Sequence, residues 1–289
     1  MSSEAIETVV VDGLALAQQL RKEMSEEVGK LVGSGQRPPC LAVVLVGDDP
    51  ASASYIKGKR RACKRVGMES VEHDLPAETT QDAVISLVQR LNQDEGVDGI
   101  LVQLPLPDAV NANAVAAAID PSKDVDGVGP ISGGRLLAGE EGLFPCTPLG
   151  ILAILDHYEI PLEGANAVVI GRSMIVGKPI SLMLQQRHAT VTMCHSRTRD
   201  LPGVCRRADL IVAATGSPRM VKADWIQPGA AVIDVGVSSV DGELVGDVDL
   251  ENAIGVASLI TPHRRGVGPM TITMLLHNTL IAYRSRISR

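Results

Sequence analysis

Residues 167–179 read Ala-Val-Val-Ile-Gly-Arg-Ser-Met-Ile-Val-Gly-Lys-Pro, and this stretch decides the fold class of the second half of the chain. The apolar run at 167–170 is typical of a strand buried on both faces. A turn begins at Gly171, and Pro179 favours the start of a helix. Open α/β folds hold the pyrophosphate of a dinucleotide at such a turn. The pattern has Ser173 where the usual fingerprint has its second glycine, so a tight turn without a ligand is the alternative.

The residues after the next predicted strand, Thr190–Cys194, favour NADP over NAD. In an NAD site an acid near this point accepts hydrogen bonds from the ribose hydroxyls, but here no acid occurs before Asp200. Ser196 and Arg197 stand there instead, and Arg172 lies in the preceding turn. A hydroxyl and guanidinium groups suit a 2′-phosphate, which needs donors and positive charge. For Arg197 a solvated surface charge is the alternative.

Buried strands alternate with helices along most of the chain. Strands are predicted at 41–46, 70–74, 99–104, 167–170, 190–194, 210–214 and 231–235. Helices are predicted at 14–32, 51–66, 80–92, 111–119 and 178–186, from Thr147 to about Tyr158, and from about Gly268 to the end. Thr147 is the expected N-cap of its helix, and 120–142 is expected to be an irregular functional loop at a domain junction. This order predicts two parallel sheets covered by helices.

Length and composition exclude several classes of protein. The chain has 289 residues, which is long enough for two cores, and its formal net charge is −7. Only 2% of the residues are aromatic, so neither charge nor base stacking favours a nucleic-acid partner. The sequence contains no apolar run of about 18 residues and no signal-peptide pattern. We therefore expect a cytoplasmic protein without a membrane partner.

Four polar residues of the first half are candidates for chemistry. Tyr55 and Lys59 are four positions apart on a predicted helix, so they share one face. Gln103 ends an apolar strand, and Asp126 lies in the irregular stretch. A partly desolvated lysine loses its proton more readily and can then act as a general base or order a water. The alternative for the basic run around Lys59 is a solvated helix face.

Taken together, the motifs resemble the methylenetetrahydrofolate dehydrogenase/methenyltetrahydrofolate cyclohydrolase family over nearly the whole chain. The matching stretches, in order, are VGDDPASASYIKGKRRAC, GILVQLPLP, KDVDG, PCTPLG, VVIGRSMIVGKP, ATVTMCHSRT, PGAAVIDVG, VGDVD and GVGPMTITMLLHNT. The resemblance implies an α/β protein of two domains with a cleft between them. Residues 1–146 plus 269–289 would form a folate-binding catalytic domain, and residues 147–268 a Rossmann-like NADP-binding domain.

The resemblance also implies the roles of individual residues. Lys59 would be the catalytic group of the cyclohydrolase step, Gln103 would tune it, Asp126 would hold the pterin ring and Tyr55 would stack on the folate. The further expected substrate contacts are Gly266 and Pro269. The expected cofactor contacts are Gly171, Arg172 and Ser173 in the phosphate turn, Ser196 near the 2′-phosphate, Val237 on the nicotinamide side, and Thr147.

The implied activity is bifunctional. The nicotinamide of NADP would accept a hydride from 5,10-methylenetetrahydrofolate, and water would then convert the methenyl product to 10-formyltetrahydrofolate. No metal is required for either step. The resemblance further implies a homodimer formed through the nucleotide-binding domain, and a place in one-carbon metabolism and purine biosynthesis.

Two stretches depart from the family pattern. Three residues, His263-Arg264-Arg265, stand where the family has Val-Pro-Gly, beside the folate pocket. They could face solvent, reach the glutamate carboxylates of the substrate, or occlude the pocket. The last possibility keeps two alternatives open, a dehydrogenase with impaired cyclohydrolase activity and a non-catalytic paralogue that binds folate or nucleotide. The second departure is Ser132, which replaces a longer asparagine and is expected to make fewer hydrogen bonds.

Overall fold

The computed structural model describes residues 6–47 and 50–287, and the side chains of residues 50–55 lie outside that description. The chain forms two compact units. Unit 1 contains Met1–Ala17 and Thr147–Thr271, and unit 2 contains Gln18–Cys146 and Ile272–Arg289. The predicted division placed residues 1–17 in the first domain, and this is wrong because β1 (Val9–Val10) pairs with β11 (Leu259–Ile260) in unit 1.

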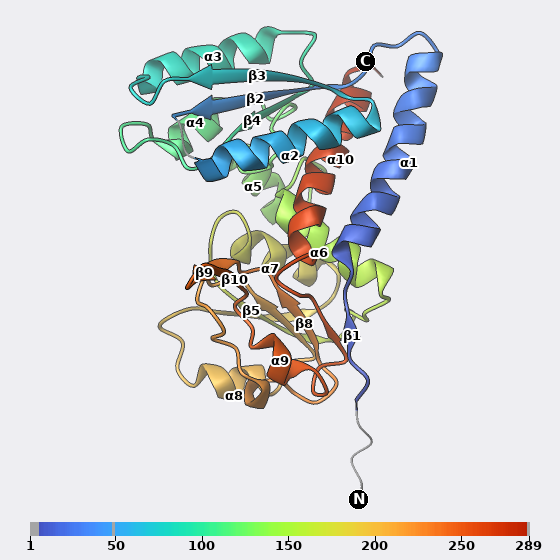
Figure 1. The fold of residues 1–289 in the computed structure, drawn as a ribbon, viewed down its shortest axis with the longest axis vertical. Helices are drawn as coiled ribbons and strands as arrows, with labels where there is room; N and C mark the ends of the chain where they lie inside the picture. Colours follow the sequence, from blue (N-terminus) through green and yellow to red (C-terminus); the bar gives the residue numbers. More distant parts are fainter. Residues whose placement is uncertain (1–5, 48–49, 288–289) are drawn as a thin grey trace, which may run out of the picture. The chain divides into compact units, whose positions relative to one another are not determined.

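Unit 2 contains a parallel sheet of strand order β3-β2-β4 (Figure 1). Its strands are β2 (Cys40–Val46), β3 (Glu69–Leu75) and β4 (Gly99–Val102), and its further elements are α2 (Pro50–Val66), α3 (Gln81–Gln93) and α4 (Ala112–Ala118). Helices α3 and α4 pack on the sheet face that Ala42, Val44 and Ile100 form. As predicted, the aliphatic runs of β2 and β4 form buried strands. Because all three strands are parallel, their carboxyl ends lie at one edge, where Gln103 follows β4.

A helix occupies part of the stretch that was predicted to be irregular. Helix α5 spans Pro130–Ala138, with proline at its first position and Gly139 in the left-handed conformation at its C-cap. The helix was not predicted because two glycines lie inside it, and glycine disfavours a helix interior. The carboxylate of Asp124 accepts hydrogen bonds from Gly129 N at 2.9 Å and Ser132 Oγ at 2.6 Å. The short Ser132 side chain therefore fits a buried site.

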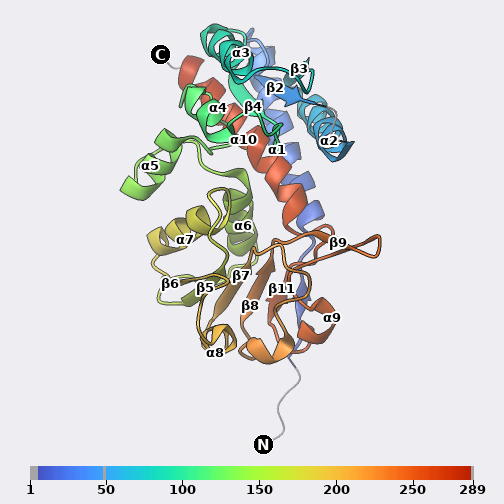
Figure 2. The ribbon, with the colours of Figure 1, turned by 90° about the vertical axis from the view of Figure 1, so that its left-hand side faces the viewer.

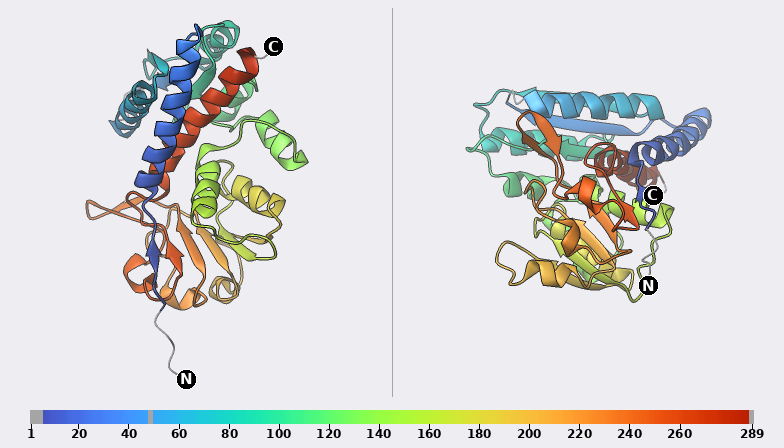
Figure 3. Two further views of the ribbon diagram at one scale, coloured as in Figure 1. Left: turned by 90° about the vertical axis from the view of Figure 1, so that its right-hand side faces the viewer. Right: turned by 60° about the horizontal axis from the view of Figure 1, so that its bottom comes forward.

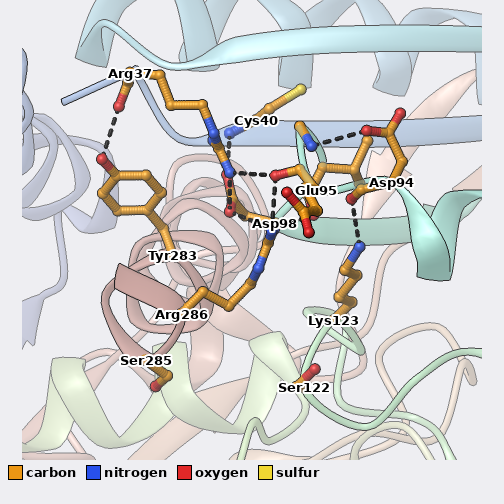
Figure 4. Close-up of polar contacts among 12 residues, drawn as sticks. Arg37, Cys40, Asp94, Glu95, Asp98, Ser122, Lys123, Tyr283, Ser285 and Arg286 are labelled. Carbon is orange, nitrogen blue, oxygen red and sulfur yellow. Dashed lines mark hydrogen bonds and ion pairs between the residues drawn. The ribbon is translucent and has the colours of Figure 1, made fainter. Parts of the chain in front are cut away.

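Within unit 2, the part of α1 (Gly13–Gly33) after Ala17 lies beside the part of α10 (Val267–Ile287) after Thr271 (Figure 3). Arg21 Nε donates to Thr273 Oγ1 at 2.9 Å and so joins them. The end of α10 is held by Asp98, which is fully buried. Asp98 accepts hydrogen bonds from Arg37 Nη1 at 2.7 Å and Arg286 Nη1 at 2.9 Å (Figure 4). This cluster fixes α10 to the amino ends of β2 and β4.

Unit 1 is built on a parallel sheet of strand order β1-β11-β8-β7-β5-β6 (Figure 2). Its remaining strands are β5 (Asn166–Ile170), β6 (Thr190–Cys194), β7 (Leu210–Ala213) and β8 (Ala231–Asp234). The helices of this unit include α6 (Cys146–His157), α7 (Gly177–Gln186), α8 (Leu201–Cys205) and α9 (Leu250–Ala253), and β9 (Ser238–Val240) and β10 (Glu243–Val245) form a hairpin. The chain leaves β5 for β6 on one side and returns to β7 on the other, so a topological switch point lies at the carboxyl end of β5.

Helix α6 corrects one predicted cap. It begins at Cys146, so Thr147 lies inside the first turn and is not the N-cap. The Thr147 hydroxyl instead contacts Thr271 Oγ1 at 2.9 Å. Among the described residues, no helix is both long and apolar enough to cross a membrane.

Candidate active site

Lys59 and Gln103 meet in unit 2. Lys59 lies on α2, and its Nζ donates to Gln103 Oε1 at 2.8 Å. Gln103 Nε2 in turn donates to the carbonyl of Leu104 at 2.6 Å. Because that second bond fixes which end of the amide is oxygen, Gln103 can only accept from the lysine. The geometry therefore orients the amine of Lys59.

Burial and charge tune the same lysine. Burial lowers the pKa of Lys59, and the nearby Asp126 carboxylate opposes that change. Burial also raises the pKa of Asp126, while Lys59 opposes this shift. A lysine with a lowered pKa releases its proton more easily and can take one up during a reaction. The set Lys59, Gln103 and Asp126 thus has the properties of an acid–base site.

Asp126 also lines a small apolar cavity of about 30 Å³. Ile100, Val102 and Leu104 form part of its wall. The turn that carries Asp126 is anchored at Gly127, whose φ is +68° and where a Cβ would lie 2.2 Å from the backbone of Phe144. A cavity of this size is close to the volume of one water molecule, so it shows a carboxylate beside apolar walls and is too small to enclose a ring.

The phosphate turn of unit 1 depends on close backbone contacts. Gly171 has a φ of +128°, and a Cβ there would lie 2.2 Å from the carbonyl oxygen of Ala214. A Cβ on Gly177 would lie 2.3 Å from the carbonyl oxygen of Gly171. Ser173 Oγ accepts from Val176 N at 3.1 Å and from Gly177 N at 3.3 Å. The serine that replaces the second glycine therefore shapes the turn at the start of α7.

The loop after β6 and the turn after β5 present the groups that were predicted to select NADP. Ser196, Arg197 and Arg172 are all exposed. The loop is shaped by His195, whose Nδ1 accepts from Arg197 N at 3.2 Å and whose N donates to Thr198 Oγ1 at 2.9 Å. His195 thus has a structural role, and the hydroxyl and guanidinium groups around it are free to face solvent.

Three other predicted site residues belong to unit 1, and a fourth lies outside the described side chains. Val237 is 51% exposed and follows β8 in unit 1. Gly266 is buried in a tight turn, because a Cβ there would lie 2.1 Å from the carbonyl oxygen of Pro262. Pro269 lies in the first turn of α10 and also belongs to unit 1. Tyr55 belongs to the first part of α2, whose side chains lie outside the described residues.

The unusual loop His263-Arg264-Arg265 is partly explained by an ion pair. Arg265 has a φ of +63°, which suits the glycine of the family pattern, and its Nη2 lies 2.6 Å from Asp12 Oδ2. Arg264 is exposed. Burial lowers the pKa of His263, and Arg264 and Arg219 lower it further. Both arginines are therefore exposed, and the ion pair holds Arg265 on Asp12.

Sequence reasoning missed Asp234 and Asp247, two buried acids in unit 1. They lie in the stretches PGAAVIDVG and VGDVD, which carried the family resemblance without a stated role. Asp234 could have been noticed in the sequence, because an acid at the end of an apolar strand is unusual.

A Rossmann-like sheet with a glycine-bearing phosphate turn, combined with an oriented lysine on a second α/β unit, defines a nucleotide-dependent dehydrogenase with an additional acid–base site. Residues 11–126 match the family model of the tetrahydrofolate dehydrogenase/cyclohydrolase catalytic domain, and residues 145–287 match that of the family's NAD(P)-binding domain. The chain belongs to the tetrahydrofolate dehydrogenase/cyclohydrolase family.

Individual relatives agree with this assignment. The bifunctional protein FolD 2 of Geobacter sulfurreducens is 53% identical over 274 residues, covering 94% of this chain and 96% of the relative. The bifunctional FolD enzyme of Campylobacter jejuni has a crystal structure with a TM-score of 0.95 at 45% identity, covering 96% of this chain and 99% of that one. The Trypanosoma brucei dehydrogenase-cyclohydrolase, solved with NADP and an inhibitor, has a TM-score of 0.93 at 38% identity, covering 98% and 99%.

Proposed function

We propose that this protein is an NADP-dependent enzyme that oxidises 5,10-methylenetetrahydrofolate and hydrolyses the methenyl product to 10-formyltetrahydrofolate. The observation that carries the proposal is the 2.8 Å contact between Lys59 and Gln103 beside Asp126. A dehydrogenase without the second activity would have no use for an oriented lysine of lowered pKa. The family assignment supports both activities together.

The phosphate turn of unit 1 fits NADP. Gly171 lets the turn pack closely on Ala214, where any side chain would collide, and the N-terminus of α7 supplies positive potential. Arg172 and Ser196 would bind the 2′-phosphate, and the backbone at Val237 would contact the nicotinamide side. Thr147 is proposed as a further cofactor contact. When bound, NADP supplies the hydride acceptor, and the protein contributes alignment of the substrate carbon.

We assign hydrolysis of the methenyl group to residues of unit 2. Water adds to the methenyl carbon and gives one proton to the neutral amine of Lys59. The bond from this carbon to N5 then opens, N5 takes up a proton as the new hydroxyl group loses one, and the formyl group stays on N10. Gln103 holds the amine in place by accepting one of its hydrogens. Asp126 would accept hydrogen bonds from the polar edge of the pterin, and Tyr55 would stack on the folate. Gly266 and Pro269 are proposed to border the substrate.

The alternatives are less well supported. Retention of the contact between Lys59 and Gln103 argues against impaired cyclohydrolase activity. The non-catalytic paralogue was suggested by the unusual loop, but the ion pair of Arg265 with Asp12 accounts for one of its arginines without any occlusion.

We further propose a homodimer formed through unit 1. Its sheet ends at β6, an edge strand on which Met193 is 40% exposed. Unpaired strand edges and exposed apolar side chains favour association with a second copy. A cytoplasmic location and a contribution to purine biosynthesis are proposed together with the one-carbon activity.

The direct test supplies the purified protein with 5,10-methylenetetrahydrofolate and either NADP or NAD, and follows the reduced cofactor. Acid then converts formyl product back to methenyl, which is counted by its absorbance. Reduction of NADP in excess of the methenyl found before acid would support both steps. Absence of reduction with either cofactor would overturn the proposal.

A further inference from the structure

Two buried carboxylates, Asp234 and Asp247, stand outside the roles assigned so far. Asp234 is the last residue of β8 and is 3% exposed, and Asp247 follows the β9–β10 hairpin and is fully buried. Asp234 ends a strand of the nucleotide-binding sheet, and Asp247 contacts the loop that follows β7 of the same sheet. The carboxyl edge of such a sheet is where dinucleotides bind.

Asp247 joins two loops that are far apart in sequence. Its Oδ2 accepts from Thr215 N at 2.6 Å and from Gly216 N at 3.1 Å, directly after β7. Its Oδ1 is buried and has no hydrogen-bond partner among the described residues. A Cβ on Gly236 would lie 2.1 Å from this carboxylate, so the turn after β8 is fitted against it. One side chain therefore sets the separation of the loops after β7 and β8.

Asp234 holds the backbone on both sides of this contact, at Gly236 and at Asp247. Its Oδ1 accepts from Gly236 N at 3.1 Å and from Asp247 N at 2.9 Å, and its Oδ2 accepts from Val248 N at 3.0 Å. Burial raises the pKa of Asp234 to about 7, the backbone N–H groups oppose that shift, and Asp247 adds to it. A buried pair of mutually repelling acids opposes folding. The two acids therefore do not serve to stabilise the fold. Their hydrogen bonds instead hold the backbone of the loops after β7 and β8 in place.

We propose that Asp247, held by Asp234, is a positioning residue for the nicotinamide half of NADP. The inference rests on the proposed function, in which the backbone at Val237 contacts the nicotinamide side. Val237 directly follows Gly236, the residue that packs against Asp247. The carboxylate acts through the main chain at 215–216 and 236–237 and touches no reacting atom. The adenosine half is bound from β5 and β6 and does not depend on it.

The test compares Asp247→Ala with the wild type in three assays on the full-length enzyme. The substitution leaves two backbone N–H groups without their acceptor, so the loops move. Hydride transfer needs close alignment, and a displacement of about 1 Å costs about 100-fold in rate. We expect the dehydrogenase kcat to fall by this factor. Binding of 2′,5′-ADP, which probes the adenosine half alone, and hydrolysis of methenyltetrahydrofolate should be unchanged.

Two further variants separate positioning from general stability. Asp247→Asn keeps an oxygen that can accept from both N–H groups, so it should retain most of the hydride-transfer rate. Asp209→Ala removes a carboxylate that accepts from Asn166 N at 2.8 Å, at the amino edge of the same sheet, and should leave all three assays unchanged. A thermal melt of each variant confirms that it folds.

The outcomes are distinct. A dehydrogenase rate in Asp247→Ala that matches the wild type would overturn the inference. So would an equal loss of 2′,5′-ADP binding and hydride transfer, since that would indicate a structural role for the whole unit. A wild-type enzyme without hydride transfer would instead refute the proposed function, and the affinities of Asp247→Ala for NADP and 2′,5′-ADP would then still test the positioning role.

Discussion

Replacing Lys59 by methionine should separate the two activities. Methionine keeps an unbranched side chain of similar length but has no amine. The contact with Gln103 Oε1 at 2.8 Å and the proton acceptor are lost together. General acid–base catalysis contributes about 10²- to 10⁴-fold to a rate. Because each tenfold factor corresponds to about 1.4 kcal/mol, the barrier to hydrolysis should rise by about 3–5 kcal/mol.

The assay follows the absorbance of methenyltetrahydrofolate as it is hydrolysed, beside a separate measurement of NADP reduction. Hydride transfer moves no proton through Lys59, so dehydrogenase turnover should persist in the variant. Lys57→Met is the matched control, since Lys57 is an exposed residue of the same helix and lies two positions away, on another face. It should leave both rates unchanged.

The pH dependence of the hydrolysis rate is a second test of the role of Lys59. Burial lowers the pKa of Lys59 from its ordinary value of 10.5. Because the neutral amine accepts the proton, the hydrolysis rate should rise with pH and level off above that lowered pKa. Enzymatic hydrolysis in Lys59→Met at the wild-type rate, with the same rising limb, would refute the assignment of the lysine as the base.

Other parts of the molecule give further predictions. Arg172→Ala should weaken binding of NADP much more than binding of NAD in parallel titrations, and equal effects would remove the argument for a 2′-phosphate contact. Asp98→Ala should destabilise the protein by about 3 kcal/mol in urea unfolding, because two arginines lose their common buried partner; an unchanged midpoint would contradict this. Arg265→Gly loses an exposed ion pair with Asp12 but relieves a left-handed backbone, so stability and folate affinity should change little; a large gain in affinity would favour occlusion. Burial raises the pKa of Asp234 from 3.8 to about 7, so folding favours the protonated carboxyl; this stabilisation is fully present below pH 3.8 and is lost as pH rises through about 7. The free energy of unfolding should therefore fall between these two pH values, and Asp234→Asn should make that fall smaller. An unaltered slope in the variant would refute the shift.

The parts of the fold that the sequence predicted well are those with one dominant local signal. Aliphatic runs such as 41–46 and 167–170 form buried parallel strands, because short runs rich in β-branched residues favour strands buried on both faces. Helix α5 was missed because its two interior glycines suggest a loop, whereas a proline at its start and the carboxylate of Asp124 stabilise its first turn. Strands β1 and β11 are too short for any periodicity, and they form only because each pairs with a neighbour in unit 1.

The candidate site shows the same limit. Lys59 was a candidate because it lies four positions from Tyr55 on a predicted helix. Its partner Gln103 was a candidate because it is a polar residue at the end of an apolar strand. Their contact at 2.8 Å could not be derived from spacing, because it depends on how α2 packs against β2 and β3. Asp234 and Asp247 were overlooked for a related reason. An acid in a sequence is usually exposed, and only the fold shows that these two are enclosed by backbone N–H groups.

The path of the chain through the two units has a consequence for biosynthesis. Unit 2 is assembled from residues 18–146 and 272–289, and all of 147–271 is translated between them. Asp98 and Arg286 are 188 positions apart. Since domains fold as their residues leave the ribosome, unit 2 cannot be completed, and its buried acid lacks one arginine, until the whole nucleotide-binding segment has been made. Nascent chains released before Arg286 should therefore be substrates for chaperones or proteases, while the segment that forms most of unit 1 can already have folded.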